Sequence, residues 1–173
     1  ILLSLIITTL VVSPYLYRNY KNFKTITITK SFGYNLLKGN NPTLKVEGND
    51  EFVIDNYVRK KNLKIETKND YEIKLDDLYK NEAIMYIKKE PLKYLKFYFK
   101  KVFSFTFIDF DSSYPNYYNI LHLAPKIVLS IISLIGALIV ISKKGLYQFL
   151  SIFYFTNIFL FSIFFILPRY SLI

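Results

Sequence analysis

Apolar residues are concentrated near the two ends of the chain, and polar residues fill its middle. Residues 1–13 are mostly apolar, and two longer apolar runs follow at residues 119–142 and 146–167. A helix rises ~1.5 Å per residue, so about 20 residues cross the ~30 Å hydrocarbon core of a bilayer. The two long runs therefore predict transmembrane helices, and residues 1–13 predict the C-terminal half of a truncated one.

Residues 14–118 between these runs predict a small domain outside the bilayer, with mixed α/β structure. All 13 acidic residues of the chain lie between Glu47 and Asp111, which indicates an aqueous environment. Ile and Thr alternate over residues 23–30, and this period of two predicts a half-buried strand. Two further short strands are predicted at residues 52–54 and 63–67.

Residues 76–106 predict two helices. Asp76 and Asp77 suit the positive N-terminus of the first helix, and Pro91 suits the first turn of the second. The second helix has an apolar stripe, formed by Leu92, Leu95, Phe99, Val102 and Phe103. Four lysines flank this stripe: Lys93, Lys96, Lys100 and Lys101. The pattern favours a helix lying on a membrane surface, although an amphipathic helix packed on its own domain has the same pattern.

The positive-inside rule orients the predicted spans. It counts short loops, and the short connector at residues 143–145 contains two lysines, so this connector is expected in the cytoplasm. Residues 14–118 and 168–173 then lie on the extracytoplasmic side. Arg18 and Arg169 would both stand at that membrane surface, where two guanidinium groups could bind one lipid-linked phosphate. Separate anchoring of each arginine to headgroups is the alternative.

A glycine- and asparagine-rich segment follows Arg18 and is the main candidate for a shaped loop. Glycine permits close approach of the backbone to a ligand, and asparagine supplies uncharged donors and acceptors. An ordinary surface turn would use the same residue types. The candidate residues near a site are Asn19, Gly33, Asn35, Gly39, Asn40, Asn41 and Pro42.

Composition excludes some kinds of functional site and gives little support to others. The net charge is +10, but the lysines are scattered without a recognised nucleic-acid-binding motif, so no nucleic-acid partner is expected. The chain contains no cysteine, which excludes disulfides and thiolate sites within it. The single histidine, His122, begins a predicted span and is expected to be structural. Asp109-Phe110-Asp111 is interpreted as an acidic turn, and no metal site is predicted.

Several of these segments, in order, resemble a known family. Arg18-Asn19-Tyr20, then Gly-Tyr-Asn-Leu-Leu-Lys-Gly-Asn-Asn-Pro at residues 33–42, resembles the GT-C-type membrane glycosyltransferases. The similar branch contains dolichyl-phosphate-mannose protein mannosyltransferases, lipid A aminoarabinose transferases and Rgt-like transferases. Ala-x-x-Tyr-Ile-x-x-x-Pro at residues 83–91 and the late Arg169-Tyr170 pair are also similar to that branch.

The resemblance implies transfer of a sugar from a polyprenyl-phosphate carrier to a glycan, lipid or protein acceptor of the cell envelope. It implies donor-phosphate binding by Arg18, Arg169 and Tyr170, and it places the catalytic Asp upstream of this sequence, so no catalytic residue is named. No cofactor is implied, and participation of a divalent cation is left open. The chain would then be the C-terminal part of a longer protein in the bacterial inner membrane, inactive by itself.

The expected fold is mainly α: a polytopic membrane protein fragment with a small mixed α/β insertion and an interfacial helix. Two other functions are compatible with the pattern of spans and loops. One is a non-enzymatic polytopic membrane protein, such as a transporter segment or a scaffold. The other is a ligase or polymerase of envelope polysaccharides.

Overall fold

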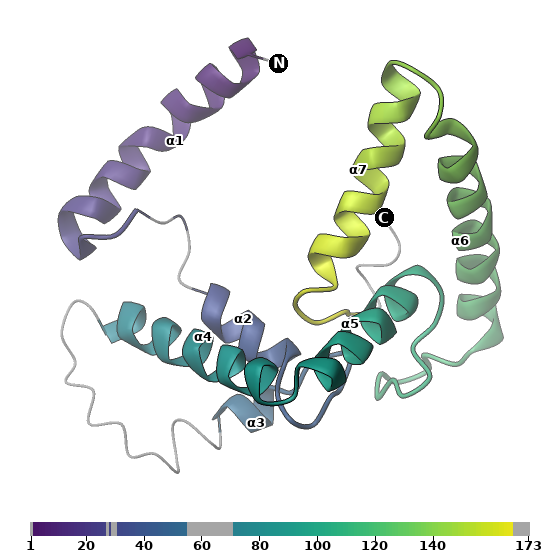
Figure 1. Cartoon of the computed structure of the whole chain (residues 1–173), viewed down its shortest axis with the longest axis horizontal. Helices are drawn as coiled ribbons and strands as arrows, with labels where there is room; N and C mark the ends of the chain where they lie inside the picture. The colour runs from purple at the N-terminus through teal and green to yellow at the C-terminus, as the bar shows by residue number, and fades with distance from the viewer. Residues whose placement is uncertain (1, 27, 29–30, 55–70, 168–173) are drawn as a thin grey trace.

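The computed structural model describes residues 2–26, 28, 31–54 and 71–167 of the chain, and these residues form helices and no strand (Figure 1). The helices are α1 (Leu2–Phe23), α2 (Phe32–Gly39), α3 (Asp50–Ile54), α4 (Tyr71–Lys89), α5 (Pro91–Thr106), α6 (Ile120–Val140) and α7 (Leu146–Phe161). The expectation of a mainly α fold is confirmed. The mixed α/β insertion is not found in the described residues.

Two of the predicted strands are wrong where the structure describes them. Phe23 is the last residue of α1, and the described residues among 24–30 are irregular. Residues 52–54 belong to helix α3, because the side chain of Asn49 accepts a hydrogen bond from the backbone N–H of Phe52 at 3.0 Å. That contact satisfies one of the free N–H groups at the start of a helix. The third predicted strand, at residues 63–67, lies outside the described residues.

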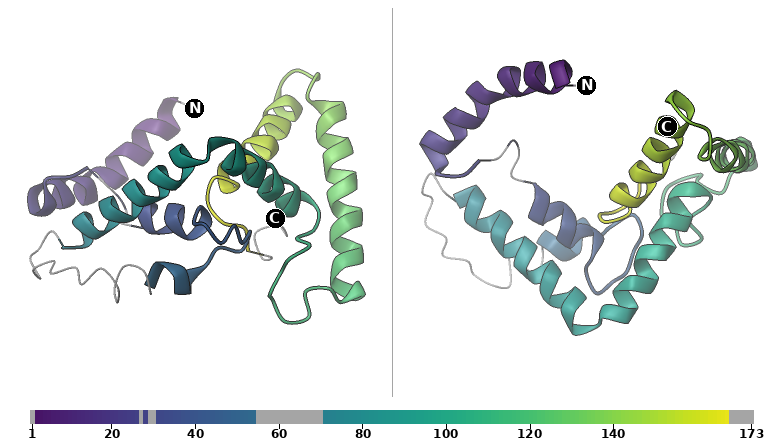
Figure 2. Two further views of the ribbon diagram at one scale, coloured as in Figure 1. Left: turned by 60° about the horizontal axis from the view of Figure 1, so that its bottom comes forward. Right: turned by 45° about the horizontal axis from the view of Figure 1, so that its top comes forward.

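Helix α1 continues past the point where the chain was expected to leave the membrane. Pro14 has no N–H to bond the carbonyl of Leu10, four residues earlier. The hydroxyl of Ser13 donates to that carbonyl at 3.1 Å instead, so the helix runs through to Phe23. Figure 1 and the right-hand view of Figure 2 show α1 apart from the other helices.

Helices α2 and α4 pack closely because Gly33 has no side chain. A Cβ atom at Gly33 would lie 1.9 Å from the carbonyl oxygen of Asp76, on α4. The carboxylate of Asp76 accepts the backbone N–H of Tyr34 at 3.1 Å, near the positive N-terminus of α2. Asp76 was predicted to cap its own helix, but α4 already begins at Tyr71. Asp76 therefore places its negative charge at the N-terminus of the neighbouring helix α2 and not at that of its own helix.

Two clusters of buried apolar residues hold the central helices together. The first joins α2, α3 and α4, and its buried members are Leu36, Leu37, Val53, Tyr79 and Ala83. The second joins α5 to the chain after α2 and after α7, and its buried members are Val46, Tyr94, Phe97 and Ile166. Tyr86, near the end of α4, packs against both clusters. The bend between α4 and α5 falls at Pro91, as predicted (Figure 2).

Helices α6 and α7 form a hairpin (Figure 1). Among the described residues, α6 is the one helix long and apolar enough to cross a membrane. Ser151 on α7 donates to the carbonyl of Ala137 on α6 at 2.8 Å. The side chain of Asn157 donates to the carbonyl of Phe153 in its own helix at 2.7 Å.

The predicted second span at residues 146–167 is only partly helical. Helix α7 ends at Phe161, and 16 residues of helix span about 24 Å, which is short of the ~30 Å bilayer core. Residues 162–167 turn back toward α2 and α5, where Ser162, Ile166 and Leu167 are buried. The backbone N–H of Ile166 donates to the carbonyl of Val46 at 2.8 Å.

Candidate functional site

The C-terminal end of α2 forms a buried polar centre, which we call the Asn40 node: Gly39, Asn40, Lys101 and the carbonyls of Ile163 and Phe164. A Cβ atom at Gly39 would lie 2.3 Å from the backbone carbonyl of Phe164, so only glycine allows this approach. Gly39 was predicted to permit close approach to a ligand. In the structure the approaching group is the chain that follows α7.

The side-chain amide of Asn40 is fully used inside this node. Its nitrogen donates to the carbonyls of Leu36 at 2.9 Å and Ile163 at 2.8 Å. Its oxygen accepts a hydrogen bond from the ammonium of Lys101 at 2.9 Å. Residues 40 and 163 are therefore joined directly, although they are far apart in the sequence.

Lys101 is completely buried, although the sequence pattern placed it with the exposed lysines. Its ammonium contacts four oxygens: Gly39 O at 3.2 Å, Asn40 Oδ1 at 2.9 Å, Ile163 O at 3.2 Å and Phe164 O at 2.6 Å. It also lies 4.9 Å from the ring centroid of Phe97. Burial lowers the pKa of Lys101 to about 7, since a charged group is poorly solvated there. The enclosed ammonium holds three segments together and does not face solvent.

Asn41 shapes the turn that leaves the node. Its side chain donates to the carbonyl of Lys38 at 2.7 Å and accepts the backbone N–H of Thr43 at 2.9 Å. Leu44 follows with φ of 53°, a left-handed conformation that is uncommon for leucine. Segment 33–42, predicted as a loop, is thus a helix to Gly39 followed by a buried cap and an ordered turn.

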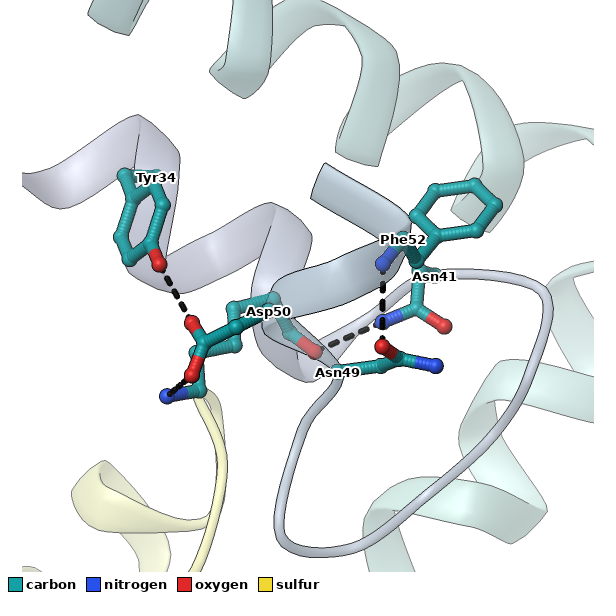
Figure 3. Close-up of polar contacts among 6 residues, drawn as sticks. Tyr34, Asn41, Asn49, Asp50 and Phe52 are labelled. Carbon is teal, nitrogen blue, oxygen red and sulfur yellow. Dashed lines mark hydrogen bonds and ion pairs between the residues drawn. The ribbon is translucent and has the colours of Figure 1, made fainter. Parts of the chain in front are cut away.

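A second polar group joins α2 to the start of α3 (Figure 3). The carboxylate of Asp50 accepts hydrogen bonds from the Tyr34 hydroxyl and from Lys38, the latter at 2.7 Å. Burial raises the pKa of Asp50, but the hydrogen bonds from Lys38 and Tyr34 outweigh it, and the pKa ends below its ordinary value. The Lys38 ammonium also lies 4.3 Å from the ring centroid of Phe165. These contacts tie α3 to α2 and to the chain after α7.

A third polar group links the turn after α2 to the loop before α6. Glu47 is buried, and its carboxylate accepts hydrogen bonds from the hydroxyls of Ser112 and Ser113 and from the backbone N–H of Ser113. Asp109 is also buried, and burial together with the charge of Glu47 raises its pKa. The backbone N–H of Asp111 donates to the Asp109 carboxylate, consistent with the predicted acidic turn.

The predicted site residues fall into three sets. Gly33, Gly39, Asn40 and Asn41 are buried and make the structural contacts described above; Asn35 is half-buried and Pro42 is exposed. Arg18 is exposed and Asn19 is buried on α1, and Figure 1 shows this helix apart from α5. Arg169 and Tyr170 lie outside the described residues. The structure thus neither joins nor separates the two arginines.

Lys101 is the central residue of the node, and the apolar pattern of α5 did not predict its burial. A signal was present, since Tyr94, Phe97 and Ser104 share its side of α5 at spacings of seven, four and three residues. Those three residues are buried in the structure. In the part of the chain that the structure describes, no group of three or more His, Cys, Asp or Glu side chains could hold a metal ion.

The described residues define a helical chain with a buried lysine-centred node and one helix, Ile120–Val140, suited to crossing a membrane. Comparison with known protein families, with curated proteins and with solved structures found no match to this chain.

Proposed function

We propose that the chain is the C-terminal part of an integral-membrane glycosyltransferase. It would move a sugar from a polyprenyl-phosphate-linked donor to a lipid, polysaccharide or protein acceptor of the cell envelope, in the bacterial inner membrane. The proposal begins from the ordered resemblance to GT-C-type enzymes at residues 18–20, 33–42, 83–91 and 169–170.

One observation carries the proposal beyond that resemblance: the resembling segment 33–42 meets the chain after α7 at the Asn40 node. Asn40 and Lys101 bind the carbonyls of Ile163 and Phe164, five and four residues before Pro168. A surface turn would not need a buried ammonium and a fully bonded amide to hold it. The node instead suits a scaffold that holds residues 163 and 164, just after α7, against α2 and α5.

A cavity of about 260 Å³ beside the node supports a lipid-linked substrate. Its walls are mostly apolar and include Leu36, Ile87 and Leu95, with Asn40 at one side. The hydroxyl of Tyr98, another wall residue, already donates to the carbonyl of Phe159 at 3.0 Å. Such a lining favours a hydrocarbon chain over a polar ligand.

We further propose that α1, α6 and α7 all enter the bilayer, with residues 14–118 on the extracytoplasmic side. The exposed apolar side chains along these helices support this arrangement. In this arrangement Arg18 and Arg169 share one membrane face and bind the donor phosphate, the leaving group of the reaction, together with Tyr170.

The test is sugar transfer by the full-length protein in membranes, with radiolabelled undecaprenyl-phosphate glucose and undecaprenyl-phosphate aminoarabinose as donors. Arg18→Lys and Arg169→Lys should each lower the rate or donor affinity roughly ten- to a hundred-fold, since one charge-assisted contact is worth ~1.5–3 kcal/mol. Lysine keeps the charge but lacks the paired donors of guanidinium. Arg59→Lys, at the one other arginine of the chain, is the matched control and should be active.

Two results would count against the proposal. If the wild-type protein consumes neither donor, a non-enzymatic membrane protein becomes the better interpretation. If both Arg→Lys variants keep wild-type kinetics, the arginines are headgroup anchors, which lysine replaces well.

A further inference from the structure

A groove of about 440 Å³ runs along one side of helix α5. Its lining residues are Leu44, Leu92, Lys93, Lys96, Phe97 and Lys100. The groove thus combines apolar walls with three ammonium groups.

The three lysines are spaced to lie in one row. Positions 93, 96 and 100 are three and four residues apart, so their side chains lie on the same side of the helix. The row lies between two faces of α5: Tyr94 and Phe97 are buried on one, and the apolar stripe is exposed on the other. The exposed fractions of the stripe residues are 74% for Leu92, 52% for Leu95, 57% for Phe99 and 44% for Phe103.

The charge of the row is only partly compensated. Lys93 pairs with Glu90 at 2.9 Å, and Lys100 pairs with Asp111, both at exposed positions where ion pairs contribute little. Lys96, between them, has no hydrogen-bond or ion-pair partner among the described residues. Like charges one helical turn apart repel each other. An anion beside Lys96 would relieve that repulsion.

The apolar wall opposite the lysines is held in place. Leu44 has φ of 53°, and its backbone N–H donates to the carbonyl of Asn41 at 3.2 Å. Its side chain packs against the buried cluster of Val46, Tyr94, Phe97 and Ile166. The groove is therefore built on the core of the protein and is not a gap between loose side chains.

We propose that this groove binds the phosphate headgroup of an anionic phospholipid, with Lys96 as the central contact. The lipid's acyl chains would lie along the exposed stripe beside Leu92 and Phe99. Charge complementarity, the apolar walls and the adjoining stripe all favour a lipid over a free anion. The proposal rests on the bilayer location of the chain proposed above, and it is independent of sugar transfer.

The chain contains no tryptophan, so Phe99→Trp provides a single fluorescent reporter on the stripe. The full chain carrying this reporter is reconstituted in phosphatidylcholine vesicles that contain brominated phosphatidylglycerol or, at the same mole fraction, brominated phosphatidylcholine. Bromine quenches tryptophan on contact. We expect an apparent preference of roughly five-fold for the anionic lipid, as for one lysine at an anionic surface.

Matched variants assign the preference to the groove. Lys96→Gln should remove most of it, and the Lys93/Lys96/Lys100→Gln triple variant should remove it entirely. Lys80→Gln, at an exposed lysine of α4 outside the groove, should keep it. High salt should weaken the preference because the contact is electrostatic.

Several results would overturn the proposal. Equal quenching by both lipids, or a preference that survives in the triple variant, would exclude a phospholipid site at these lysines. Blue-shifted emission without quenching would mean that protein, such as a second copy of the chain, covers the stripe. Loss of the preference on adding millimolar inorganic phosphate would indicate a site for a free anion. None of these results depends on glycosyltransferase activity, so the two proposals can fail separately.

Discussion

Replacing Lys101 by Met is the most informative single perturbation of this structure. Methionine has a similar length and no charge, so it fills the space and removes the donor. The ammonium of Lys101 contacts four oxygens, and of these Ile163 O keeps the amide of Asn40 as a second donor. The other three oxygens, Gly39 O, Asn40 Oδ1 and Phe164 O, lose this contact.

The expected loss follows from two opposing effects. Each buried acceptor left without a donor costs about 1–3 kcal/mol. Against this, burying an ammonium itself costs several kcal/mol, which the methionine variant avoids. We expect the free energy of unfolding to fall by about 2–3 kcal/mol, as for other broken buried polar networks.

The measurement is thermal unfolding of the full chain in mild detergent, followed by circular dichroism. Lys100→Met is the matched control, because Lys100 is adjacent in sequence and its one ion pair, to Asp111, is exposed. Its effect should be about 0–1 kcal/mol. Equal unfolding temperatures for Lys101→Met and the control would refute the reasoning, since the buried contacts would then contribute nothing.

The pH dependence provides an independent check with a definite sign. Burial lowers the pKa of Lys101 to about 7, from an ordinary value of 10.5. Between these values the unfolded chain holds more protons than the folded one, so stability rises with pH, by at most about 1.4 kcal/mol per unit. Below pH 7 both states are protonated and the contribution is flat. The wild-type protein should gain stability from pH 7 to 9 relative to Lys101→Met; equal slopes would contradict this.

Three further predictions test other parts of the structure. Gly33→Ala should destabilise the chain by at least ~2 kcal/mol because its Cβ would clash with the backbone of α4. Gly136→Ala is the control: its Cβ meets open space, so this variant should be neutral or slightly stabilising. Similar melting temperatures for the two variants would contradict the helix packing. Ser151→Ala should cost about 1 kcal/mol by removing the bond between α6 and α7, and no change in unfolding would show that the hairpin does not need it. In intact cells, Thr43→Cys should react with an impermeant thiol reagent and Lys144→Cys should not. Each label reports a single position because the chain has no native cysteine. The opposite labelling would invert the proposed topology.

Patterns along the sequence predicted those helices whose formation depends mainly on neighbouring residues. The period of apolar residues and Pro91 defined α5, and the length of the apolar run defined α6 to within two residues at each end. The position of the acidic turn at Asp109 followed from the same kind of argument. By contrast, residues 52–54 resembled a strand in composition alone, and a single cap from Asn49 made them helical.

By itself, the sequence determined that the chain is mainly helical, where its long apolar runs lie, and which face of α5 is apolar, because periodicity and run length are properties of neighbouring residues. The tertiary structure alone decided that Lys101 is buried, that α7 ends at Phe161, and that Gly33 and Gly39 serve helix packing and chain approach. Each of these outcomes depends on groups more than 40 residues apart, such as the carbonyls of Ile163 and Phe164 beside an ammonium on α5. A pattern read along the chain contains no information on which distant carbonyl will meet a given lysine, and only the packing of α2 and α5 against the chain after α7 supplies it.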